Sequence, residues 1–167
     1  LAKGGRSHRG RESNQPLDAK AQGCSVSEAA LQDVLLTEIF VSSRRIAVVG
    51  LSPDPSKASY GVAQYLSQYY EVVPVNPNYE DIEGVPCYPT VASIPRPVDL
   101  IDVFQRSERV PDFVDDALAA GSPYFWMQLG IRNAAARAAL EAKGVQVVDD
   151  LCTKVEHARL LREGALG

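Results

Sequence analysis

The stretch that decides the fold is Arg45-Ile-Ala-Val-Val-Gly50. It is a short β-branched run that a glycine ends, too short for a helix and apolar enough to be buried on both faces. We therefore expect a first central strand over 45–49. A strand covered on both faces is typical of a parallel sheet, because crossover connections place helices on the two faces.

Strand-like and helix-like segments alternate along the chain after Gly50. The strand-like segments are 71–75, 98–104, 124–128 and 144–148. The helix-like segments are 60–69, 108–120, 133–143 and 154–162. This order predicts an α/β fold, a Rossmann-like open parallel five-stranded sheet with helices on both faces. The caps agree with it: Ser107 and Asn133 can cap helix starts, while Gly121 and Gly144 lie just past helix ends.

The chain before this alternation divides into an arm and a helix. Residues 1–24 are rich in Gly, Ser, Arg and Lys with almost no apolar periodicity, which predicts an extended basic N-terminal arm. Ser25-x-x-Glu28 has the pattern of a capping box, and apolar residues such as Leu31, Val34 and Ile39 follow at helical spacing, so we expect a helix over 27–40. The expected organisation is an arm at 1–24, an N-terminal helix in 25–44, a domain at 45–162 and a tail at 163–167.

Composition places the chain among soluble globular domains. Hydrophobic residues make up 46% and charged residues 23% of 167, a balance that one buried core requires, and no apolar run approaches the ~20 residues that cross a bilayer. The net charge is −4 although the arm is basic, so the folded part is acidic and is not a broad nucleic-acid-binding surface. Cys24, Cys87 and Cys152 form no CxxC pair, which favours a reducing compartment.

The arm leaves the location of the protein open. The chain starts at Leu1, and its opening stretch is basic and hydroxyl-containing with no acid before Glu12, as in a trimmed organellar presequence. We expect the mitochondrial matrix or another organelle if the arm has that origin, and the cytoplasm if it is an expression remnant. The arm could also dock on a protein partner.

Ligands of an open parallel sheet bind beyond the carboxyl ends of its strands. The loop after the first strand, residues 50–61, leads into a helix whose first free N–H groups we expect around 59–61. A helix start of this kind is an anion site, so a phosphate or diphosphate fits there. A stiff connecting loop with a solvated Lys57 is the alternative interpretation.

The sequence lacks the marks of two common nucleotide sites. A dinucleotide site has GxGxxG and an acidic residue about 20 residues further on, whereas this loop turns on one glycine and Asn76 ends the second strand. No GxxxxGK[ST] occurs either. NAD is thus disfavoured, and a Rossmann dehydrogenase is kept only as a minor alternative.

Five segments carry a resemblance, among them Gly-Leu-Ser-Pro-Asp-Pro-Ser-Lys at 50–57 and Trp-Met-Gln-Leu-Gly-Ile-Arg at 126–132. Together they resemble the small single-domain CoA-binding proteins, which are similar to the CoA-binding domain of the succinyl-CoA synthetase α subunit. The resemblance implies coenzyme A (CoA) or an acyl-CoA as the cofactor. The site residues that it implies are Gly50, Leu51, Ser52, Lys57, Ser59, Tyr60, Gly61, Asn76, Pro77, Val103, Phe104, Arg106, Gln128 and Gly130.

The resemblance places the CoA diphosphate near Gly50, Ser52 and the start of the next helix. Lys57 and Arg106 are then the cations available for phosphates. Arg106 could instead be a surface arginine.

The same resemblance assigns the other parts of the cofactor. Asn76 and Pro77 would border the adenosine, Val103 and Phe104 would flank the cofactor, and residues 128–130 would lie toward the pantetheine. Phe104 could instead be a core residue.

The chain offers few groups for catalysis. The resembled synthetase family transfers phosphate through a histidine in a second domain, and this chain ends before such a domain, so we expect no complete catalytic apparatus. His8 lies in the arm, and His157 follows Glu156 as either a base with its orienter or a structural pair on a packed helix. Two lone histidines give no metal-site spacing. Cys152 could form a mixed disulfide with the pantetheine thiol, or be a small buried residue.

Three functions compete on these grounds. The first is a non-catalytic module that binds CoA or an acyl-CoA and acts through it. The second is a structural or accessory subunit of a larger, organellar assembly that retains the CoA-binding fold. The third is the CoA-supplying component of an acyl-CoA ligase that acts with a partner chain.

Overall fold

A computed structural model describes residues 25–167 of the protein. Five parallel strands form one sheet in the order β2-β1-β5-β6-β7. They are β1 (Arg45–Val49), β2 (Glu71–Val75), β5 (Leu100–Val103), β6 (Tyr124–Met127) and β7 (Gln146–Val148). The predicted open five-stranded parallel sheet is confirmed, whereas the predicted arm lies outside the described residues.

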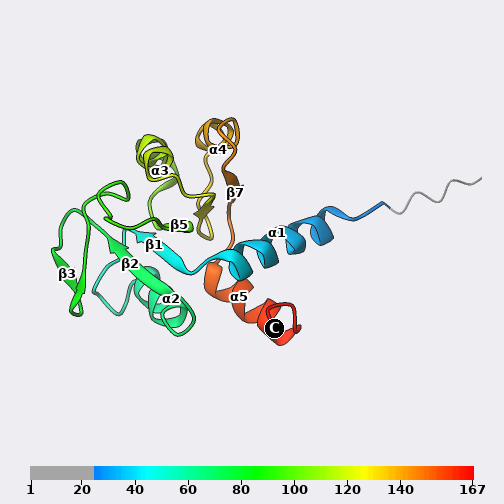
Figure 1. The fold of residues 1–167 in the computed structure, drawn as a ribbon, viewed down its shortest axis with the longest axis horizontal. Coiled ribbons are helices and arrows are strands. Elements are labelled where there is room, and N and C mark those ends of the chain that lie inside the picture. Colours follow the sequence, from blue (N-terminus) through cyan, green and yellow to red (C-terminus); the bar gives the residue numbers. More distant parts are fainter. Residues whose placement is uncertain (1–24) are drawn as a thin grey trace, which may run out of the picture.

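Helices cover both faces of the sheet (Figure 1). Successive residues of β1 point to opposite faces, so Ile46 and Val48 join one core while Ala47 and Val49 join the other. The first core is completed by α1 (Glu28–Ser42), α2 (Ala58–Leu66) and α5 (Thr153–Arg162). The second core is completed by the 3-10 helix η1 (Ser107–Phe113), α3 (Val114–Ala120) and α4 (Ala134–Glu141). No helix in residues 25–167 is both long and apolar enough to cross a membrane.

α1 contributes only one of its apolar faces to the first core. Leu36, Ile39 and Phe40 are buried against α5 and the sheet. Leu31 and Val34, which the sequence pattern grouped with them, are 58% and 65% exposed. The helix is apolar on several sides, so the packing of the rest of the chain decides which side is covered.

Side-chain caps fix two helix starts. The Oγ of Ser27 accepts the N–H of Ala30 at 3.2 Å, so Ser27 and not the predicted Ser25 caps α1. The Oδ1 of Asn133 accepts the N–H of Ala136 at 2.9 Å, which confirms the predicted cap of α4.

The helix predicted over 108–120 is divided into η1 and α3. Pro111 lies inside the segment and has no N–H to donate, so the regular helix begins only at Val114. The predicted cap at Ser107 is wrong, because its Oγ accepts the N–H of Arg132 at 3.0 Å and does not bond to η1.

A small hairpin follows β2 and was not predicted. Its strands β3 (Asp81–Ile82) and β4 (Val85–Pro86) have two residues each, too few to show an alternating pattern. Glu83 and Gly84 both have positive φ, 52° and 81°, as a two-residue hairpin turn of type I′ requires. A parallel bridge between Val75 and Tyr88 attaches the segment to the free edge of β2.

Candidate functional site

The strand order reverses between β1 and β5, because the chain first adds β2 on one side of β1 and then places β5 on the other. Open parallel sheets bind ligands at the carboxyl ends of such a pair of strands. A cleft of about 500 Å³ lies there. It is lined by Gly50, Ser52, Lys57, Ala58, Ser59, Phe104, Gln105, Arg106 and Ile131. All but Ala58, Gln105 and Ile131 are among the predicted site residues.

The loop after β1 is held in shape by its own side chains. Ser52 accepts the N–H of Asp54 on its Oγ at 3.1 Å and donates its own N–H to the Oγ of Ser59 at 3.1 Å. The Asp54 carboxylate accepts the N–H and the hydroxyl of Ser56 at 2.9 and 2.8 Å, and these bonds lower the pKa of the carboxyl below its usual value. The cleft therefore has one ordered wall before any ligand arrives.

The first turn of α2 offers unused hydrogen-bond donors to the cleft. Lys57 precedes the helix, and its side chain does not cap it. Within residues 25–167, the N–H groups of Ala58 and Ser59 meet no acceptor, whereas the N–H of Tyr60 donates to the Lys57 carbonyl at 3.1 Å. The free donors thus begin one residue earlier than predicted. They lie at the positive end of the helix dipole, where an anion is stabilised.

Two cations flank these donors. Lys57 lines the cleft from the α2 side and Arg106 from the β5 side. Neither side chain forms an ion pair with another residue in the described part of the chain. Phe104 adds an apolar surface to the lining of the cleft. The cleft is therefore a positive site in an acidic domain, suited to an anionic ligand with an apolar portion.

Asn76 and Pro77 do not line this cleft. The side-chain amide of Asn76 donates to the Leu51 carbonyl at 3.0 Å, and its oxygen accepts the N–H of Asn78 at 3.0 Å. The first of these bonds joins the loops after β1 and β2, and the second lies within the loop after β2. Pro77 is exposed just beyond them.

Val103 and Gln128 are buried beneath the strand ends. Val103 packs in the second core with no exposed surface. The Gln128 amide donates to the Asp102 carboxylate at 2.6 Å and to the Thr153 hydroxyl at 2.7 Å, and Thr153 in turn donates to Asp102 at 2.9 Å. Burial raises the pKa of Asp102 to about 7, against the opposite effect of these hydrogen bonds. Gln128 thus links β6 to β5 and α5.

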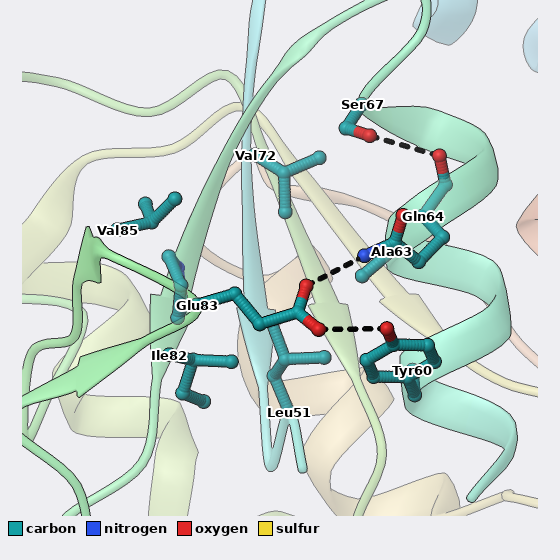
Figure 2. A pocket seen from close by; sticks show the side chains of 10 residues that line it. Leu51, Tyr60, Ala63, Gln64, Ser67, Val72, Ile82, Glu83 and Val85 are labelled. Atoms are coloured by element: carbon teal, nitrogen blue, oxygen red, sulfur yellow. Dashed lines mark hydrogen bonds between the residues drawn. The ribbon is translucent and has the colours of Figure 1, made fainter. Parts of the chain in front are cut away.

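A second hollow, of about 160 Å³, lies between α2 and the β3–β4 hairpin (Figure 2). Leu51 and Tyr60 line this hollow and not the cleft, and Gly61 lines neither. The carboxylate of Glu83 crosses the hollow, where it accepts the Tyr60 hydroxyl at 2.7 Å and the Gln64 amide at 2.8 Å (Figure 2). These bonds tie the hairpin to α2.

The candidate catalytic pair is not formed. His157 is buried among four aromatic rings and shares a hydrogen bond of 2.9 Å with the Tyr65 hydroxyl, and burial lowers its pKa. Glu156 pairs instead with Arg159 at 2.9 Å. Cys152 is half-buried against the first core at the start of α5.

No group of three or more His, Cys, Asp or Glu side chains in residues 25–167 is arranged to hold a metal ion. His8 lies outside these residues.

The fold is a parallel α/β domain with a cleft at its topological switch point, lined by two cations and by the start of α2. The chain matches the protein family described as CoA binding domain over residues 44–158. It therefore belongs to that family, and the resemblance to CoA-binding proteins is confirmed.

Two relatives match along most of their own length. YneT of Bacillus subtilis (strain 168) is 40% identical over 124 residues, which cover 74% of this chain and 92% of YneT. The solved structure of a hypothetical protein from Pyrococcus horikoshii OT3 has a TM-score of 0.75 and 32% identity, and the match covers 90% of this chain and 99% of that one.

A third relative links the family to ligases. The alpha subunit of the ADP-forming acetate–CoA ligase II of Pyrococcus furiosus is 42% identical over 67 residues, which are 39% of this chain and 15% of that subunit. The chain is thus a CoA binding domain related to acyl-CoA ligase subunits.

Proposed function

We propose that this protein binds CoA or an acyl-CoA in the cleft between the ends of β1 and β5 and acts as a non-catalytic binding or regulatory module. The observation that carries the proposal is the pair of unused N–H groups at Ala58 and Ser59, beside Lys57 and Arg106, in a chain of the CoA binding domain family. Helix N–H groups and nearby cations are the donors that a diphosphate requires.

The loops around the cleft suggest how the cofactor would lie. The diphosphate would occupy the turn at Gly50 and Ser52. The adenosine would extend toward β2, where Asn76 stands in place of the acid that dinucleotide sites use for the ribose hydroxyls. The pantetheine would cross Phe104 toward residues 128–130. Val103 and Gln128 would then support the site from below instead of touching the ligand.

The environment of His157 supports a binding role over catalysis. Its ring is enclosed by aromatic side chains of α1, α2 and the segment that follows α2, and it shares a hydrogen bond with Tyr65. It does not line the cleft. A proton carrier for chemistry on bound CoA would need to reach the cleft.

Calorimetric titration with CoA, dephospho-CoA and NADH tests the proposal. We expect saturable binding of CoA, weaker binding of dephospho-CoA if its missing phosphate meets a cation, and no binding of NADH. Absence of CoA binding would overturn the proposal. Tighter binding of NADH than of CoA would favour a dehydrogenase-like cofactor instead.

A second candidate is the CoA-supplying component of an acyl-CoA ligase, favoured by the 42% identity to the acetate–CoA ligase subunit. In that role a partner chain would hold the nucleotide site and the phosphorylated group. Co-purification with such a chain, together with CoA-dependent nucleotide turnover, would support this role. A protein that binds CoA alone and purifies without a partner would support the first.

Location and partner docking depend on residues 1–24, which lie outside the described part of the chain. Their basic, hydroxyl-rich composition is the basis for proposing a mitochondrial or other organellar location and an accessory role there. A fusion of residues 1–24 to a fluorescent protein tests the first point. Organellar import would support it, and diffuse cytoplasmic fluorescence would contradict it.

A further inference from the structure

Asp150 adopts a backbone conformation that few residues with a side chain adopt. It follows β7 with φ 56°, in the left-handed region that favours glycine. Strained positions of this kind persist only where surrounding contacts hold them, and they gather at functional sites. The hydrogen bonds of Asp150 therefore indicate which part of the molecule this conformation supports.

Asp150 holds the loop that follows β6 by three sets of hydrogen bonds. Its carboxylate accepts the N–H of Gly130 at 2.7 Å on one oxygen. The other oxygen accepts the Arg132 guanidinium at 2.8 and 3.1 Å. Its own N–H donates to the Ile131 carbonyl at 3.2 Å. The residue fixed between these bonds is Ile131, which lines the cleft.

The same loop is also attached to the segment that follows β5. Arg132 N–H donates to the Ser107 hydroxyl at 3.0 Å, and the Asn133 amide donates to the Ser107 carbonyl at 3.0 Å. Ser107 directly follows Arg106, one of the two cations of the site. The contacts of Asp150 and Ser107 thus fix the position of Ile131 relative to Arg106.

The order of the strands says which part of a ligand this loop would meet. β6 is separated from β1 by β5, so its loop lies about 10 Å across the sheet from the loop at Gly50. Ile131 and Phe104 are apolar and suit an aliphatic chain, whereas Lys57 and the free N–H groups suit phosphate. The β6 side of the cleft therefore matches the pantetheine half of CoA.

We propose that Asp150 is a positioning residue for the pantetheine half of CoA, acting through the 130–132 loop that it holds against the cleft. The proposal rests on the proposed function. Asp150 does not line the cleft, so the effect must pass through Ile131. Loss of the hydrogen bonds between Asp150 and the 130–132 loop should weaken the binding of ligands that contain pantetheine. It should not change the binding of ligands that lack pantetheine.

The test compares CoA with 3′-phospho-ADP, which is CoA without its pantetheine, by calorimetry on the full chain. We expect Asp150→Asn to weaken CoA about tenfold, the effect of losing one charge-assisted hydrogen bond, and to leave 3′-phospho-ADP unchanged. Asp149→Asn is the matched control, because Asp149 pairs with Arg137 at 3.2 Å and does not line the cleft. It should leave both ligands unchanged.

Asp150→Gly separates the carboxylate from the backbone strain. Glycine adopts the positive φ without strain, so this variant should fold although it lacks the carboxylate hydrogen bonds to Gly130 and Arg132. Its CoA affinity should fall as in Asp150→Asn. CoA binding of wild-type strength in either variant, or an equal loss for both ligands, would refute the positioning role. A wild-type protein that does not bind CoA would instead refute the proposed function, and this role with it.

Discussion

Gly50 lies so close to Phe104 that no side chain fits between the two residues. A Cβ on Gly50 would overlap the Phe104 carbonyl oxygen and lie 3.0 Å from the Gln105 side-chain nitrogen. Gly50 also has φ 84°, a conformation that L side chains rarely adopt. The turn that opens the cleft therefore requires glycine for two independent reasons.

Gly50→Ala should destabilise the protein and disturb the cleft together. The unfavourable backbone conformation alone should lower the free energy of unfolding by about 1 to 3 kcal/mol, and the overlap with Phe104 adds to this. Urea unfolding measures the stability, and CoA titration of the folded variant measures the site.

Gly61→Ala is the matched control for this prediction. Gly61 lies inside α2 without a positive φ, and a Cβ added to it would meet no atom within 4 Å. Alanine there should raise the free energy of unfolding by about 0.5 to 1 kcal/mol, because it limits the unfolded chain. Equal stability of the two variants would contradict the role assigned to Gly50.

Lys57→Ala and Arg106→Ala should each weaken CoA without unfolding the protein. Both side chains line the cleft, and a charge-assisted contact to phosphate contributes on the order of 1 to 3 kcal/mol of binding free energy. The affinity of the wild type should also fall as salt rises, and less so in the variants. Lys143→Ala, beyond α4 and outside the cleft, is the control and should leave CoA affinity unchanged. If Lys57→Ala or Arg106→Ala also left CoA affinity unchanged, the substituted residue would not belong to the site.

The strands could be predicted because buried parallel strands are unbroken apolar runs between turn signals, as at Arg45–Val49. The sequence does not predict which face of α1 is covered. Leu31 and Val34 are as apolar as Leu36, and only the position of the sheet and α5 decides that Leu36 is buried. Local patterns specify that a helix forms, whereas the arrangement of distant elements selects its face.

The candidate site also has residues that the sequence predicts and residues that it does not. Gly50 and Lys57 lie in one loop, so their proximity follows from the chain itself. Ile131 carries no local signal, because it reaches the cleft only through the strand order. Gln128 follows a strand and looked available to a ligand, but its partners Asp102 and Thr153 are 26 and 25 residues away in the sequence.

Leu36→Ala tests whether α1 belongs to the core of the domain. Leu36 is 1% exposed, so its truncation should lower the free energy of unfolding by about 2 to 5 kcal/mol. Val34→Ala, two residues away on the exposed face, should change it by less than about 0.5 kcal/mol. If Leu36→Ala changed stability as little as Val34→Ala, α1 would be an appendage and not part of the core.

Asp102→Asn should change how the stability of the protein depends on pH. Burial raises the pKa of Asp102 from 3.8 to about 7, so between these values the folded protein binds a proton that the unfolded chain releases. The contribution of Asp102 to the free energy of unfolding of the wild type should therefore fall as pH rises from about 4 to about 7 and should be constant above that range. Asparagine keeps the shape of the side chain and does not titrate.

The difference between the variant and the wild type isolates this contribution from other titrating groups such as His157, whose lowered pKa acts in the opposite direction. At about pH 4 the variant should have nearly the stability of the wild type, because the Asn amide, like the protonated Asp102 carboxyl, offers one acceptor oxygen to Gln128 and one donor to Thr153. As pH rises to about 8, its stability relative to the wild type should increase by up to a few kcal/mol. Urea unfolding across this range measures the difference, and a pH-independent difference would mean that Asp102 does not titrate in the folded protein.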